Sequence, residues 1–177
     1  SPERAAPLAG ETRQQRVLLP GNADWVELAG SGPGFYVLQT TGERVDTRIT
    51  VFADGSRELL ADENGGEGAN AFVALFLGVR RIFARIAAAD PEQGGPYGLS
   101  FTRVEPRPVY AQAGPQALQV GAVPEVLQLR VFQSGRYLLS ASGGPSPAAP
   151  QVSVFSLPAM RSVKPGEPEG LHNLSAG

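Results

Sequence analysis

The chain has 177 residues, of which 42% are hydrophobic and 18% are charged, and its formal net charge is −2. This length is enough for one domain or two small domains with packed cores, whereas the near-neutral charge argues against a nucleic-acid partner, which usually requires a basic surface. Because there are no cysteines, disulfides, cysteine-based zinc sites and thiol nucleophiles are excluded. The 22 glycines and 16 prolines predict many turns rather than long helices.

The chain begins SPERAAPLAGETRQQ, with neither an initiator methionine nor an apolar signal segment. That beginning fits a mature exported protein whose signal has been removed, and it fits equally an internal boundary of a longer sequence. Residues 1–14 are polar and rich in alanine, proline and glycine, so we expect a flexible leader there. No run approaches the roughly 18 apolar residues of a membrane span, and we expect none.

From residue 15 onwards, short segments carry β-branched or aromatic residues at alternate positions and are separated by glycine-rich turns, which predicts strands. The predicted strands are 17–19, 25–28, 35–40, 48–52, 58–60, 71–77, 81–86 and 97–104. An alanine-rich helix through 71–89 is the alternative, but its segments are short, β-branched and bounded by glycine, which favours strands. Eight short strands at close spacing predict a β-sandwich over 15–104.

A proline-rich stretch at 105–116 is predicted to be a linker, and after it the pattern of the first region begins again. Four pairs of segments correspond, namely 17–19 with 118–120, 24–28 with 125–129, 34–40 with 135–141, and 48–52 with 151–155. The residue numbers differ by 101 in the first three pairs and by 103 in the last. We therefore predict a partial repeat over 117–162, followed by a tail at 163–177.

A partial repeat of this kind amounts to half of a sandwich. Half of a sandwich exposes an apolar face and unpaired strand edges, which is costly and favours aggregation. We expect the second region to be covered by the first region, by a second chain such as the partner in a homodimer, or by sequence outside these 177 residues.

Six stretches of the first region follow one another in a characteristic order. DWVEL and GFYVLQT come first, DTRITVFADGSRELLADENGG with NAFVALFL follows, and RRIFARI with YGLSFTRV ends the region. In this order they resemble the bacterial pre-peptidase C-terminal domain over residues 17–104, and the first half of that domain again over 117–160. In this family an acidic residue precedes an apolar strand, as Asp46 precedes 48–52 here, and the last strand carries apolar residues in alternation, as Tyr97, Leu99 and Phe101 do. The hairpin departs from the family pattern, because Arg81-Ile82-Phe83 stands where the family has glycine-x-tyrosine.

The resemblance implies an all-β, jelly-roll-like antiparallel β-sandwich, with a second, abbreviated β-unit after it. Such domains are non-catalytic and are attached to secreted proteases and other exported proteins. They assist secretion or maturation, or hold the enzyme to insoluble protein or polysaccharide, and some relatives bind calcium. The resemblance therefore implies a periplasmic or secreted location.

The loop ADENGGEGAN after the fifth predicted strand is the best candidate for a ligand site. Calcium takes six to eight oxygen ligands, and this loop is dense in side-chain oxygens while its glycines allow backbone carbonyls to turn inward. The candidate ligands are Asp46, Asp62, Glu63, Asn64, Glu67 and Asn70. Their spacing does not match an EF-hand, and the alternative is a solvated connection that uses aspartate, asparagine and glycine for turn geometry. We expect a connector first, with calcium as the alternative, and no other cofactor.

Catalysis finds little support in the sequence. The single histidine, His172, lies in the predicted tail, so a Ser-His-Asp triad has no folded element to hold it. Asp62 and Glu63 could form the carboxylate pair of a hydrolase, but adjacent residues of a strand point to opposite faces. The aromatic residues that could stack on a sugar are Trp25, Tyr36, Tyr97, Tyr110 and Tyr137, for which core packing is the favoured alternative.

These observations predict a non-catalytic binding or accessory module of an exported bacterial protein, which holds a protein or polysaccharide surface or serves a parent exported enzyme. The second hypothesis is a structural or assembly protein of the cell envelope, in which another subunit completes the half-sandwich. A hydrolase is the third.

Overall fold

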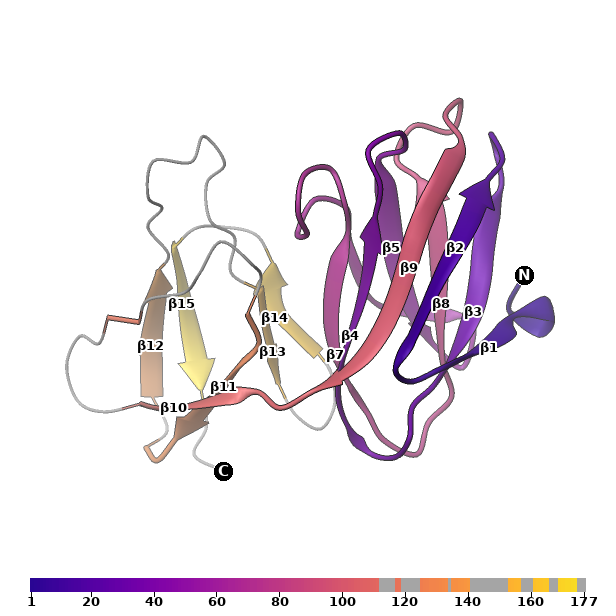
Figure 1. Ribbon diagram of the computed structural model, residues 1–177. Coiled ribbons are helices and arrows are strands. Elements are labelled where there is room, and N and C mark those ends of the chain that lie inside the picture. The colour runs from indigo at the N-terminus through magenta and orange to yellow at the C-terminus, as the bar shows by residue number, and fades with distance from the viewer. Residues whose placement is uncertain are drawn as a thin grey trace. The chain divides into compact units, whose positions relative to one another are not determined.

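The structure, a computed structural model, describes residues 1–111, 117–118 and 125–133 in full, and the backbone of four further strands at 135–140, 153–156, 161–165 and 169–174. Its regular structure is almost entirely β, as predicted, and the one helix among these residues is the short η1 (Pro2–Arg4). The chain divides into two units, the first made of Ser1–Glu105 and the second beginning at Pro106 (Figure 1).

The first unit is a sandwich of two sheets (Figure 1). One sheet has the strand order β1 (Ala6–Ala9), β3 (Ala23–Ala29), β8 (Ile82–Ala88), β5 (Thr47–Ala53) and β6 (Arg57–Asp62). The other has the order β2 (Thr12–Leu18), β9 (Gly95–Val104), β4 (Gly34–Thr41) and β7 (Phe72–Leu77). Neighbouring strands are antiparallel except β1 and β3, which are parallel. Every connection except the β5–β6 hairpin passes to the other sheet, which is the winding of a jelly-roll-like sandwich.

The core lies between the two sheets and is filled by the alternating side chains of each strand. In β4, Tyr36 and Leu38 are 0% exposed, and the Tyr36 ring stacks on Phe101 of β9 with ring centroids 4.9 Å apart. The facing sheet contributes Val26, Ile49, Val51 and Ile86, which are also 0% exposed. The period-two pattern of the sequence therefore corresponds to the pleat of each strand, with one face toward the core.

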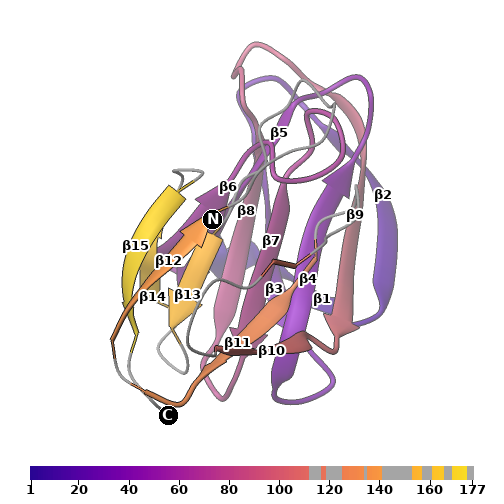
Figure 2. The ribbon, with the colours of Figure 1, turned by 90° about the vertical axis from the view of Figure 1, so that its left-hand side faces the viewer.

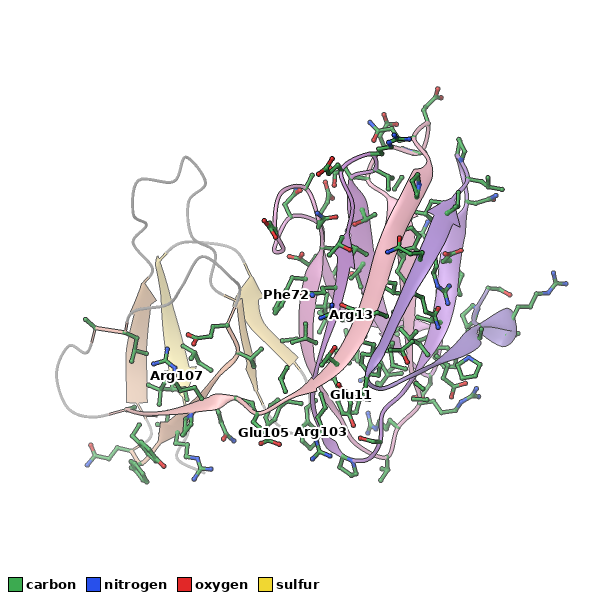
Figure 3. All side chains as sticks on the ribbon, viewed as in Figure 1. Glu11, Arg13, Phe72, Arg103, Glu105 and Arg107 are labelled. Atoms are coloured by element: carbon green, nitrogen blue, oxygen red, sulfur yellow. The ribbon has the colours of Figure 1, made fainter. Side chains whose placement is uncertain are left out.

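The predicted flexible leader at 1–14 is wrong, because these residues contain β1 and the start of β2. Leu8 of β1 is 0% exposed and lies opposite Leu28 of β3 in the parallel register. Between the two strands Glu11 adopts a left-handed backbone with φ of 62°, and its carboxylate accepts a hydrogen bond from the Arg103 backbone N–H at 2.8 Å (Figure 3). β1 has four residues and one large apolar side chain, which is too little for an alternating pattern to appear in the sequence. Only the structure shows that it pairs with β3.

The alternative of a helix through 71–89 is excluded by the structure. This segment forms β7 and β8, in opposite sheets. β8 lies in the middle of its sheet and is buried on both faces, so its side chains do not alternate between core and solvent. A strand that is buried on both faces appears in the sequence as a nearly continuous apolar run. Such a run is also compatible with a helix, which is why a helix was the alternative prediction.

The described strands of the second unit form three two-stranded sheets (Figure 2). β10 (Arg107–Ala111) is parallel to β11 (Leu127–Val131), β12 (Gly135–Ser140) is antiparallel to β15 (Glu169–Leu174), and β13 (Ser153–Ser156) is antiparallel to β14 (Arg161–Pro165). The predicted strand at 118–120 falls mostly outside the described residues, as do parts of the predicted repeat at 141–152 and 157–160.

Two predictions about the second half of the chain need correction. The proposed linker at 105–116 contains β10, which is hydrogen-bonded to β11. The proposed tail at 163–177 contains the end of β14 and the whole of β15, in which His172 lies opposite Tyr137 of β12. Both segments are rich in proline, glycine or polar residues, and only a partner strand distant in the sequence makes them strands.

Candidate functional site

The acidic, glycine-rich loop joins the end of β6 at Asp62 to the start of β7 at Phe72. One carboxylate oxygen of Asp62 accepts two backbone hydrogen bonds, from Gly65 N–H at 2.8 Å and from Phe72 N–H at 2.9 Å, so Asp62 closes the loop at both ends. A β-carbon added at Gly65 would lie 2.7 Å from the Asp62 carboxylate, which leaves room for glycine alone at this position. Asp62 and Gly65 therefore serve the geometry of this turn.

Asn70 holds the other side of the same loop. Its side chain is 7% exposed, and its amide nitrogen donates to the carbonyl oxygens of Glu67 at 2.6 Å and Gly42 at 3.2 Å. The Gly66 N–H donates to the Asn70 carbonyl at 2.8 Å. The loop is thus closed internally and is also attached to the β4–β5 connection through Gly42.

The structure does not bring the six predicted calcium ligands together. The Asp62 carboxylate is occupied by backbone N–H groups, and Glu63 lies 3.9 Å from the guanidinium of Arg48. Over the described residues, no three aspartate, glutamate, histidine or cysteine side chains gather where they could hold a metal ion. One buried side-chain oxygen each on Asp46 and Asn70 has no hydrogen-bond partner. Calcium takes six to eight oxygen ligands, and calcium binding at this loop stays a prediction.

A buried polar cluster joins the two sheets of the first unit. Tyr97 of β9 is 1% exposed and donates its hydroxyl proton to the Asp24 carboxylate of β3 at 2.6 Å, while the Arg16 guanidinium lies 3.5 Å from the same carboxylate. Burial, together with the hydrogen bond to Asp24, raises the pKa of Tyr97 well above its ordinary value of 10.0. Tyr97 is therefore a neutral hydrogen-bond donor that fixes β9 against β3, which is a structural role rather than that of an acid or a base.

Tyr36 and Trp25, the aromatic candidates of the first unit considered next, pack within the sandwich. Tyr36 is buried in the core, as predicted, and its hydroxyl donates to the Gly32 carbonyl at 2.9 Å. Trp25 is half-buried and packs on Phe52 of the same sheet, with ring centroids 5.2 Å apart. These rings are held against neighbouring strands rather than presented to a ligand.

The second unit presents aromatic rings to solvent. Tyr110 on β10 is 45% exposed and Phe132, just after β11, is 67% exposed. Their rings are nearly parallel, with centroids 6.0 Å apart and an interplanar angle of 6°, and the Arg130 guanidinium lies 5.9 Å from the centre of the Tyr110 ring. We call Tyr110, Arg130 and Phe132 the aromatic patch. Tyr110 and Arg130 are opposite one another in the β10–β11 register, so they share one face of this sheet, and Phe132 continues it two residues on.

Sequence analysis found Tyr110 but missed Arg130 and Phe132. The available signal was a large apolar residue immediately before the turn QSG, where polar residues are the rule. The parallel pairing that brings Phe132 to Tyr110 joins residues 20 or more positions apart, and no local pattern shows it.

Comparison with known proteins gives two similar folds. No protein-family model and no curated protein matches the chain. Among solved structures, the pre-peptidase C-terminal domain of collagenase from Bacillus anthracis has a TM-score of 0.48 at 14% identity, covering 57% of this chain and 97% of that one. A periplasmic inhibitor of g-type lysozyme from Aeromonas hydrophila has a TM-score of 0.43 at 11% identity, covering 55% and 93%. The first of these two structures is a pre-peptidase C-terminal domain, which is the family that residues 17–104 resemble in sequence.

In the part of the chain that the structure describes, no helix has the length and apolar character needed to cross a membrane.

Proposed function

We propose that this chain is a non-catalytic binding or accessory module of an exported bacterial protein, and that its aromatic patch contacts a polysaccharide or protein surface. The observation that carries the proposal is the exposed, nearly parallel pair of rings Tyr110 and Phe132. Exposed aromatic rings offer a large apolar area with few rotatable bonds, so ordering them against a partner costs little entropy. Aromatic residues and arginine are also the side chains that most often dominate binding energy at interfaces.

The contrast with the first unit supports this assignment. There the large rings Tyr36, Tyr97 and Phe101 are 0% or 1% exposed and stabilise the core. Asp62, which sequence analysis considered for a carboxylate pair, accepts hydrogen bonds from backbone N–H groups. A periplasmic or secreted location belongs to the proposal and rests on the sequence resemblance to domains of exported proteins.

Binding to insoluble surfaces tests the proposal. The full chain is mixed with cellulose, chitin, peptidoglycan or an insoluble fibrous protein, and the bound fraction is measured by sedimentation of the solid. Tyr110→Ala and Phe132→Ala should each weaken binding to the preferred surface by about tenfold, since truncating a ring at the centre of an interface costs more than 1 kcal/mol.

Val79→Ala is the matched control, because Val79 is 100% exposed on the first unit and lies outside the aromatic patch. It should bind like the unmodified chain. Equal binding of all variants, or no binding to any surface, would contradict the proposal.

The second candidate function, an assembly protein of the envelope completed by another subunit, is favoured by the two-stranded sheets of the second unit. Isolated pairs of strands are marginal in water and gain stability from a third strand. Sedimentation across a hundredfold dilution separates the two functions. A dimer that resists dilution supports assembly, and a monomer supports the accessory module.

A further inference from the structure

The loop between β6 and β7 contains an asparagine followed by a glycine, Asn64-Gly65, and the Asn64 side chain is exposed. In such a pair the backbone nitrogen of the glycine can attack the side-chain amide of the asparagine, because glycine has no β-carbon to hinder the approach. Of the four asparagines in the chain, Asn64 is the only one that precedes glycine, and the others precede alanine or leucine. The sequence therefore favours spontaneous loss of the side-chain amide at Asn64.

The fold requires the glycine of this pair. A β-carbon added at Gly65 would lie 2.7 Å and 2.8 Å from the two carboxylate oxygens of Asp62. A residue with a side chain would therefore displace this carboxylate, which also accepts the hydrogen bond from Phe72 N–H at 2.9 Å. The reactive pair is thus a consequence of the way in which Asp62 closes the loop.

The nitrogen that would attack Asn64 is itself held by Asp62. The Gly65 N–H donates to the Asp62 carboxylate at 2.8 Å. Hydrogen bonds to a charged acceptor are among the stronger ones in proteins. Attack requires the Gly65 peptide to rotate toward the Asn64 side chain, and this hydrogen bond opposes the rotation. The carboxylate that imposes glycine at position 65 therefore also restrains the reaction of that glycine.

We propose that Asn64-Gly65 is a spontaneous modification site, and that the Asp62 carboxylate keeps its reaction slow in the folded chain. The Gly65 nitrogen forms a bond to Cγ of Asn64, and its proton passes through water to the side-chain nitrogen, which leaves as ammonia. Water then opens the cyclic imide at one of its two carbonyl groups, which gives aspartate or isoaspartate at position 64. This inference goes beyond the binding role of the aromatic patch and does not rest on it.

The reaction would change the charge and the backbone of the loop. Either product adds one negative charge to the formal net charge of −2, next to Glu63, whose carboxylate lies 3.9 Å from the Arg48 guanidinium. The isoaspartate product also adds a methylene to the main chain between Asp62 and Gly65. The distance that the hydrogen bond between these two residues requires is then lost.

Asn70 allows this hydrogen bond to be separated from the general rigidity of the loop. Its amide nitrogen donates to the carbonyl oxygens of Glu67 at 2.6 Å and Gly42 at 3.2 Å, so its side chain holds the loop without contacting the Gly65 nitrogen. Asn70 is also a poor site for the reaction, because it is 7% exposed and precedes Ala71. Asn70→Ala therefore loosens the loop and leaves the restraint by Asp62 in place.

Incubation of the full chain at mildly alkaline pH tests the proposal. The converted fraction at Asn64 is measured by mass spectrometry of the proteolytic peptide that contains it, in the folded chain and in urea. Conversion should be about tenfold slower in the folded chain than in urea, and Asp62→Ala should accelerate it about tenfold in the folded chain. Asp62→Asn keeps an oxygen acceptor and should react more slowly than Asp62→Ala.

Two variants serve as controls, and Trp25 fluorescence shows that each variant is folded during the incubation. Asn70→Ala should convert at the rate of the unmodified chain, and Asn64→Gln should show no comparable conversion at position 64 in either state. The proposal would be overturned by equal rates in the folded chain and in urea, or by Asp62→Ala reacting no faster than the unmodified chain. It would also be overturned if Asn70→Ala accelerated the reaction as much as Asp62→Ala, or if Asp62→Asn reacted as fast as Asp62→Ala.

Discussion

The three strand pairs described in the second unit, β10–β11, β12–β15 and β13–β14, correspond to β1–β3, β4–β7 and β5–β6 of the first unit. In the first unit β8 joins β3 to β5, and a five-stranded sheet results. In the second unit the equivalent strands β11 and β13 belong to separate two-stranded sheets. The difference teaches that β8 and β9 are the strands that join the outer pairs of the first unit into two continuous sheets around one core.

The largest expected effect tests whether the two units are independent in stability. Tyr36→Ala should destabilise the first unit by about 3–5 kcal/mol, because it removes a fully buried ring that stacks on Phe101. Tyr137→Ala, the change at the position 101 residues further on, should leave the first unit unaffected. Urea unfolding followed by the fluorescence of Trp25, the single tryptophan, reports on the first unit alone.

If Tyr137→Ala shifts the Trp25 transition as strongly as Tyr36→Ala does, the two units unfold together, and the comparison between a complete and an incomplete sandwich fails.

The next effect concerns the contact between β9 and β3. No equivalent of β9 lies among the described strands of the second unit. There Glu125, at the position of Asp24, pairs instead with Arg107 at 2.8 Å. Tyr97→Phe removes the hydroxyl donor to Asp24 and should cost about 1–2 kcal/mol at neutral pH. The same substitution should also reduce the fall in unfolding free energy as the pH becomes alkaline.

The sign of this alkaline effect follows from the raised pKa of Tyr97. Above pH 10.0, the ordinary pKa of tyrosine, the unfolded chain loses the phenolic proton while the folded chain keeps it, so stability falls as the pH rises. Tyr97→Phe should remove this contribution, whereas Tyr110→Phe in the second unit should not change the Trp25 transition. A Tyr97→Phe variant with the alkaline profile of the unmodified chain would contradict the assignment.

An effect of similar size is expected in the loop between β6 and β7. Asp62→Ala should cost about 1–3 kcal/mol, because hydrogen bonds from Gly65 and Phe72 to a charged acceptor are lost. Glu58→Ala on the exposed part of β6 is the control and should cost little. Millimolar calcium should leave the melting temperature of each variant unchanged, because no three acidic side chains gather among the described residues. A calcium-dependent rise that Asp62→Ala abolishes would instead establish a cation site here.

Much of the first unit could be predicted because successive side chains of its strands alternate between buried and exposed positions. Segments such as 35–40 and 48–52 carry apolar residues at every second position, and a strand with one buried face requires that pattern. β8 was harder, since burial on both faces removes the alternation. β1 and β15 were missed, because each has few apolar residues and becomes a strand only by pairing with a distant one.

The candidate site was also only partly predictable from the sequence. The sequence shows that the loop after β6 is dense in oxygens, but only the structure shows that the Asp62 carboxylate faces backbone N–H groups and that Glu63 lies near Arg48. Phe132 and Tyr110 come together through a parallel register, which no local pattern encodes.

By itself, the sequence determined that the chain is β-rich and cysteine-free, which segments of the first unit become strands, and that part of their pattern recurs about a hundred residues later. The tertiary structure alone decided which strands are neighbours. The physical reason is that alternation records only whether a side chain is buried, whereas the hydrogen bonds of a sheet join backbones whose partners lie far away in the chain.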